Sequence, residues 1–131
     1  MNYAFPVRVY YQDTDAGGVV FHSSYIDFME RARSEWLRSL GFSNSGLMKE
    51  HKVVFVVRSI EITYFRPAVL DDLLEVSVEI EKFGRSLMVF RQEVRRGEEV
   101  LVGARVGLVC ADTDSFKPVS VPRVIRSKLE N

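Results

Sequence analysis

The chain has 131 residues, of which 47% are hydrophobic, so residues 1–131 are long and apolar enough to form one globular domain. Lysine and arginine balance aspartate and glutamate at 18 each, which excludes a chain-wide field that would attract nucleic acid. One cysteine, no apolar run of about 18 residues and no signal peptide at the start predict a cytoplasmic protein without an internal disulfide or a membrane-spanning helix.

The first predicted strand covers Val7–Tyr11 and leads into a loop with the residue types of a chemical site. A carboxylate or an imidazole on such a loop can act as a base or nucleophile, and glycines let the backbone approach a ligand closely. The loop carries two carboxylates, paired glycines and a histidine, namely Asp13, Asp15, Gly17, Gly18 and His22.

Each of these residues also has a purely structural interpretation. Asp13 is predicted to accept hydrogen bonds from loop N–H groups, and Gly17–Gly18 is equally well explained as a simple turn. A metal site formed by Asp13, Asp15 and His22 is a weaker hypothesis, because the sequence offers no second cluster of ligands.

A helix is predicted over residues 24–40, where apolar residues recur at helical spacing. Ser24 and Asp27 resemble a capping box at its start, and Gly41 follows its last apolar residue as a stop signal. Arg33 falls on the buried side of this helix and therefore needs a partner, for which Glu30, one turn earlier, is the predicted choice.

After the helix the hydrophobic period changes to two, which indicates half-buried antiparallel strands. The predicted fold class is therefore α+β, with about five antiparallel strands packed around one long helix. Cys110 lies on the apolar face of the last strand and is predicted to be a buried, inert thiol. The four later strands are predicted at Val53–Phe65, Leu74–Ile80, Leu87–Arg95 and Val100–Ala111.

The segment DTDAGGVVFHSSYIDFMERAR, residues 13–33, resembles the signature of the hot-dog-fold acyl-CoA thioesterases, in the 4-hydroxybenzoyl-CoA thioesterase and YbgC family. The YbgC type is the most similar, because it has the DTDAGGVV run, the histidine and the E-R-A-R helix. The resemblance continues through nearly the whole chain, in residues 54–59, 64–68, 70–72 and 119–122.

The resemblance implies that Asp15 is the catalytic carboxylate, acting either as nucleophile or as general base on water. It also implies that the backbone N–H near Tyr25 stabilises the oxyanion, and that His22 orients or polarises the thioester or water. No cofactor or metal is implied, since CoA is part of the substrate.

For substrate binding, the resemblance points to Val57, Arg58, Arg85 and Ser86, while Arg58 and Arg85 are equally well explained as solvated charges at strand ends. It implies a homodimer or homotetramer with acyl slots shared between subunits, and either acyl-CoA or acyl carrier protein as the thioester donor. Because YbgC-type members accompany phospholipid-synthesis or Tol-Pal envelope proteins, peripheral association with the inner membrane is an open alternative. The acyl preference is also left open.

Two other functions are weighed against hydrolysis. Hot-dog dehydratases and hydratases share the fold and carriers, but their motif layout differs from DTDAGGVVFH. A non-catalytic module that binds an acyl carrier or a lipid-pathway enzyme is disfavoured by the intact Asp15 and His22.

Overall fold

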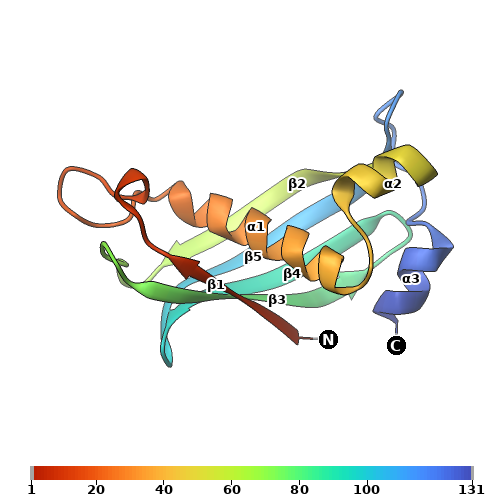
Figure 1. Ribbon diagram of the computed structural model, residues 1–131. Helices are drawn as coiled ribbons and strands as arrows, with labels where there is room; N and C mark the ends of the chain where they lie inside the picture. The colour runs from red at the N-terminus through yellow and green to blue at the C-terminus, as the bar shows by residue number, and fades with distance from the viewer. Residues whose placement is uncertain (1, 131) are drawn as a thin grey trace.

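The computed structural model describes residues 2–130. It consists of one curved, five-stranded sheet with a long helix lying across its concave face (Figure 1). In chain order the elements are β1 (Asn2–Arg8), α1 (Ser24–Ser39), α2 (Asn44–His51), β2 (Val53–Tyr64), β3 (Leu73–Phe83), β4 (Leu87–Arg96), β5 (Glu99–Asp112) and α3 (Arg123–Leu129).

The strands pair antiparallel in the order β1-β3-β4-β5-β2. Two tight hairpins join β3 to β4 and β4 to β5, whereas β1 and β2 reach their partners from distant parts of the chain and form the two edges. The prediction of a strand at Val7–Tyr11 was wrong in its bounds, because Tyr10 already begins a 3-10 turn at Tyr11–Asp13. Pro6 fits in β1 because an edge strand tolerates a missing N–H.

The predicted central helix is confirmed as α1, and Gly41 ends it in the left-handed region with φ 94°. The predicted capping box at Ser24 and Asp27 is wrong. The N-cap is Ser23 and makes no side-chain capping bond, while the Ser24 hydroxyl instead donates to the carbonyl of Asp13 at 3.4 Å. The start of the helix is therefore tied to the preceding loop and not to its own first turn.

Glu30, the predicted partner of Arg33, acts on its charge but makes no hydrogen bond with it among residues 2–130. Arg33 Nη1 donates to Gln92 Oε1 on β4 at 2.9 Å, whereas the Glu30 carboxylate accepts from the Ser34 hydroxyl at 2.6 Å. Residues four apart on a helix face meet readily, so Ser34 competes for Glu30. The buried side-chain amide of Gln92, on the other side of the core, therefore accepts the hydrogen bond from the Arg33 guanidinium.

The core lies between α1 and the concave face of the sheet, as the sequence predicts. Alternate residues of β3 are buried, and β5 presents the long apolar face expected of it. Cys110 is fully buried on β5, and burial raises the pKa of its thiol to about 11, in agreement with the predicted inert thiol. No helix in residues 2–130 is long and apolar enough to cross a membrane.

Two short helices were not predicted. In α2, the side chain of Ser43 accepts from the Gly46 N–H at 3.0 Å, and Lys52 ends the helix with φ 57°. The third helix, α3, follows Pro122 and packs Ile125 into the core. Both helices have fewer than nine residues, which is too short for a clear hydrophobic period.

Phe28 provides a test of the packing between α1 and the sheet. Its side chain is 0% exposed, so Phe28→Ala is expected to lower the free energy of unfolding by about 3–5 kcal/mol through lost burial and a cavity. Phe116→Ala, at a position 67% exposed, is the matched control with a much smaller expected change. Urea unfolding of both variants measures this, and equal midpoints would contradict the placement of the core.

Candidate active site

The loop between β1 and α1 folds back on itself as a small hairpin. Thr14 and Val20 form an isolated antiparallel bridge, and the Asp15 N–H donates to the Val19 carbonyl at 2.9 Å. Gly18 closes the turn by donating to the Asp15 carbonyl at 3.1 Å and has φ 81°, which disfavours any residue with a Cβ. Gly17–Gly18 therefore forms a turn, which is one of the two interpretations that the sequence leaves open.

Asp15 is exposed at this turn. Its Oδ1 accepts from the Gly17 N–H at 2.8 Å, and a Cβ at Gly17 would come within 3.2 Å of the same oxygen. The other carboxylate oxygen has no hydrogen-bond partner within residues 2–130. One oxygen therefore fixes the carboxylate, while the other is available to a reactant.

Asp13 has the structural role that the sequence predicts. It is buried, its Oδ2 accepts from the Tyr10 N–H at 2.8 Å, and its carbonyl accepts from the Phe21 N–H at 2.8 Å. These bonds connect the hairpin to the residues just before α1. The Asp13 carboxylate is therefore a buried structural acceptor, whereas the Asp15 carboxylate is exposed and has one oxygen without a partner in residues 2–130.

In the first turn of α1, one backbone donor has no hydrogen-bond partner within the part of the chain that the structure describes. Ser24 donates its N–H to the Phe21 carbonyl at 2.9 Å, and Ile26 donates to the Ser23 carbonyl at 3.1 Å. Between them, the Tyr25 N–H has no partner among residues 2–130. A free N–H at the positive end of a helix dipole is suited to an oxygen that gains negative charge.

The hydroxyl groups of two tyrosines hold this helix start in place. The buried Tyr25 hydroxyl accepts from the Ala68 N–H at 2.9 Å, and the Tyr64 hydroxyl at the end of β2 donates to the His22 carbonyl at 2.8 Å. Their rings meet edge to face at 5.6 Å, and burial raises the pKa of both phenols. His22 itself is exposed and lies against Phe21, with 4.3 Å between the ring centroids.

The segment of residues 65–72 forms the floor of the hairpin. The Ala68 carbonyl accepts from the Val20 N–H at 2.9 Å, and Val19 bridges to Val69. Asp72 Oδ2 anchors this segment by accepting from the Val69 N–H at 2.9 Å and from Arg96 Nη1 at 2.7 Å. The hairpin, helix start and segment 65–72 are therefore one connected unit.

The residues expected to bind substrate do not lie at this unit. Arg58 is at a β-bulge on β2, six residues before Tyr64, which corresponds to about 20 Å of strand. Arg85 and Ser86 are in the β3–β4 turn at the opposite end of the sheet, where Arg85 Nε donates to Ser120 Oγ at 2.7 Å (Figure 1). Val57 faces a cavity beside the middle of α1. Within one chain, the residues expected to bind substrate are therefore far from the junction that holds Asp15 and the start of α1.

Comparison with known proteins identifies the family of this chain. A sequence profile described as the thioesterase superfamily matches residues 17–103, which is more than half of the chain. The chain belongs to the thioesterase superfamily.

Among its relatives, the acyl-CoA thioester hydrolase YbgC of Escherichia coli is 48% identical over 124 residues, covering 94% of this chain and 92% of that protein. The acyl-CoA thioesterase YbgC of Haemophilus influenzae is 43% identical over 125 residues, covering 95% and 92%. The crystal structure of a probable thioesterase from Bartonella henselae is 38% identical with a TM-score of 0.89, covering 93% of this chain and 100% of that one. The predicted YbgC resemblance and hot-dog fold are confirmed.

Two features of this thioesterase-superfamily site were missed from the sequence. Tyr64 and Ala68 belong to a segment that supports the family resemblance, but neither their hydrogen bonds nor their contact with α1 could be predicted. They lie about forty residues beyond the helix start along the chain. Only the path of β2 across the sheet brings them there.

The anchor at Asp72 predicts a pH effect on stability. Burial by itself raises the pKa of the Asp72 carboxyl, but the Val69 N–H and Arg96 together outweigh it and hold the pKa below its ordinary value. Stability from this carboxylate is therefore complete above the ordinary pKa of about 4 and is lost as the pH falls through the lower folded-state pKa. Asp72→Asn should lower the free energy of unfolding at neutral pH by about 1–2 kcal/mol. The free energy of unfolding of this variant should also fall less steeply than that of the parent protein as the pH is lowered.

Urea unfolding at neutral and acid pH measures this effect. Asp114→Asn is the control, since Asp114 is exposed and its carboxylate has no hydrogen bond within residues 2–130. An Asp72→Asn variant with the same acid dependence as the parent protein would contradict the anchoring role.

Proposed function

We propose that this protein hydrolyses acyl-CoA thioesters of the kind named for its YbgC relatives. The observation that carries the proposal is the junction at which a half-free carboxylate, Asp15, lies on a hairpin tied to a helix start with one free N–H, that of Tyr25. The similarity to the YbgC acyl-CoA thioesterases over nearly the whole chain supports it.

Asp15 supplies the attacking oxygen in either of two ways. As nucleophile, its free oxygen attacks the thioester carbonyl carbon, the C–S bond breaks to release CoA thiolate, and water then hydrolyses the mixed anhydride. As general base, it takes a proton from water, whose oxygen attacks the same carbon and displaces the thiolate. In both routes the carbonyl oxygen becomes negative and accepts from the Tyr25 N–H.

His22 is assigned the role of orienting the thioester or the water. Its carbonyl is held by Tyr64, so the backbone is fixed while the imidazole stays exposed beside Phe21. One ring nitrogen of a neutral imidazole donates a hydrogen bond and the other accepts one. CoA is part of the substrate, and the residues at this junction supply the chemistry without a cofactor.

A second copy of the chain completes the site in this proposal. β2 is a free edge on which residues 56–59 are all exposed, including Val56 at 42% and Val57 at 45%. The other edge, β1, carries Pro6, which discourages strand pairing. Apolar residues beside a free edge favour pairing of β2 with β2 of a second copy.

Antiparallel pairing of β2 with its copy also accounts for the distance between Asp15 and the residues Arg85 and Ser86 within one chain. A two-fold axis across this edge reverses the partner, so the partner's β3–β4 turn comes to the end of the sheet that holds Asp15 in this chain. Arg85 and Ser86 of one chain then approach the site of the other. We assign Arg58 and Arg85 to the CoA phosphates, and Val57 and Ser86 to the bound thioester, on this basis.

The proposed dimer is tested by placing a positive charge on the free edge of β2. Val56→Lys places an ammonium group on the exposed edge of β2 and is expected to weaken the dimer at least tenfold, with activity falling as monomer accumulates. Val124→Lys on α3, at a similarly exposed valine, is the control. Light scattering coupled to size exclusion gives the mass, and a fully active monomer would contradict the shared site.

The chemistry is tested by replacing Asp15. Asp15→Asn keeps the shape of the side chain and a hydrogen-bond acceptor for Gly17, but removes the charge, and thiol release is expected to fall by about 10²–10⁴-fold. Asp114→Asn is the control for the loss of an exposed carboxylate.

The substrate panel consists of short, long and aromatic acyl-CoAs together with acyl carrier protein thioesters. Equal activity of the Asp15→Asn variant and the parent protein would contradict the assignment of Asp15. Enoyl absorbance from a 3-hydroxyacyl thioester, without thiol release, would overturn hydrolysis in favour of dehydration.

A further inference from the structure

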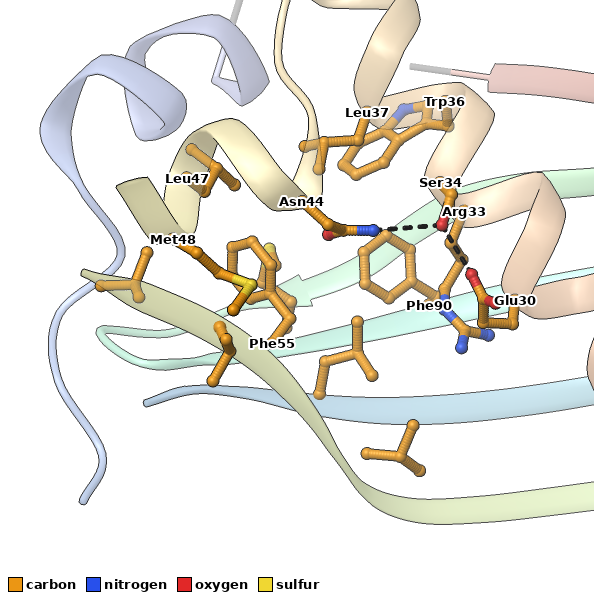
Figure 2. A pocket seen from close by; sticks show the side chains of 15 residues that line it. Glu30, Arg33, Ser34, Trp36, Leu37, Asn44, Leu47, Met48, Phe55 and Phe90 are labelled. Carbon is orange, nitrogen blue, oxygen red and sulfur yellow. Dashed lines mark hydrogen bonds between the residues drawn. The ribbon is translucent and has the colours of Figure 1, made fainter. Parts of the chain in front are cut away.

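A cavity of about 320 Å³ lies beside α1 (Figure 2), and neither Asp15 nor His22 is among its lining residues. It is lined by the second half of α1, by α2 and by the strands β2, β4 and β5, and it is open to solvent on one side, where Met48 and Val57 are exposed. Most of its wall is apolar, with Trp36, Leu37, Leu47, Phe55 and Phe90 among the lining residues. Its size is within the range of small-molecule sites.

One side of the cavity is polar. Asn44 Nδ2 donates to Ser34 Oγ at 3.2 Å, and Ser34 Oγ donates to the Glu30 carboxylate, as Figure 2 shows. Next to Glu30 in the same view lies the guanidinium of Arg33. The cavity thus combines a long apolar wall with a short strip of hydrogen-bonding groups.

Arg33 is a buried cation with few partners. It is 8% exposed, and its only hydrogen bond within residues 2–130 runs to Gln92, which is in turn held by the carbonyls of Met29 and Ser77, each at 3.2 Å. No buried side-chain nitrogen or oxygen of residues 2–130 lacks a partner, so the Arg33 nitrogens that make no hydrogen bond keep some accessible surface, and Arg33 is one of the residues that line the cavity. An apolar occupant alone would leave these donors dry and unpaired.

We propose that this cavity receives the far end of the acyl chain and that Arg33 donates a hydrogen bond to an oxygen on that end, which makes Arg33 a specificity-determining residue. The preferred acyl group then has an apolar body and a distal hydroxyl or oxo oxygen. This inference rests on the proposed function for the identity of the ligand as an acyl chain.

The position of the cavity fits such a chain. Glu30, where the cavity begins, is about 7 Å along the helix axis from Tyr25, and Arg33 is about 12 Å away, roughly the extended length of a decanoyl chain. The carboxylate of Glu30 lies beside the guanidinium and partly offsets the effect of its burial. A neutral oxygen therefore suits the strip better than a second carboxylate, which Glu30 would repel.

Trp36 provides a readout that is independent of turnover. It is the only tryptophan of the chain, it lines the cavity, and its ring meets that of Phe90 edge to face at 5.3 Å. The probes are amide analogues of decanoyl-CoA and ω-hydroxydecanoyl-CoA, in which N–H replaces the thioester sulfur so that neither is hydrolysed as a thioester. Titration of Trp36 fluorescence gives a Kd for each probe.

The parent protein should bind the hydroxylated analogue at least as tightly as the alkyl analogue, and Trp36 should respond to both. In Arg33→Met the ratio of the two affinities should shift about tenfold or more toward the alkyl analogue, the effect typical of one lost hydrogen bond to a charged group. Arg31→Met, an exposed arginine on the same helix, is the matched control and should leave the ratio unchanged.

Because Arg33→Met leaves Gln92 without its donor, thermal unfolding checks its fold, and Arg33→Lys is the second variant, expected to shift the ratio less than Met does. An unchanged ratio in a folded Arg33→Met overturns the inference. So does a parent protein that binds the hydroxylated analogue tenfold more weakly, or whose Trp36 responds to neither probe because a second copy or its own side chains fill the cavity.

Thiol release from the two parent thioesters separates this inference from the proposed function. Hydrolysis of both without a preference for the hydroxylated one, and without a Trp36 response, overturns the cavity assignment alone. A Trp36 response with the predicted ratio but no thiol release overturns the proposed hydrolysis and leaves the cavity as a binding site for acyl groups.

Discussion

The packing of α1 into the concave face of the sheet is the constraint on which the rest of the structure depends. Seven of its residues are buried, so the helix cannot shift or rotate without exposing apolar surface. This fixes the positive end of its dipole at one end of the sheet. The hairpin that carries Asp15 then closes over that end, because the Asp13 carbonyl accepts hydrogen bonds from Phe21 and Ser24.

Rigidity at the helix start comes from hydrogen bonds between distant segments. Tyr25 is held by Ala68, and Tyr64 holds the backbone of His22, so β2 and the segment of residues 65–72 determine where the free Tyr25 N–H points. An N–H fixed before reaction stabilises a developing oxyanion more effectively than one that must reorient. The two tyrosines therefore connect the stability of the sheet to the proposed chemistry.

Among residues 2–130, the buried polar and charged side chains are those of Asp13, Arg33 and Gln92, and each makes a hydrogen bond. Gln92 connects β4 to α1 and to the neighbouring strand β3, and it accepts the one hydrogen bond of Arg33 within residues 2–130. Burial lowers the pKa of Arg33, and the Glu30 carboxylate partly offsets this. A guanidinium beside an apolar cavity is costly unless its N–H groups are paired, which is the physical reason for proposing that Arg33 bonds to an oxygen of the acyl group.

The sequence by itself determined the α+β class, the helix at residues 24–40, the strands after residue 53 and the turn at Gly17–Gly18, because these depend on local periodicity and turn chemistry. It also identified the loop with Asp15, Asp13 and His22 as the candidate site. Tertiary structure alone decided the partner of Arg33, the clamp by Tyr64 and Ala68, and the separation of Arg58 and Arg85 from Asp15. Those features depend on strand order and on contacts between residues far apart in the chain, which hydrophobic periodicity does not encode.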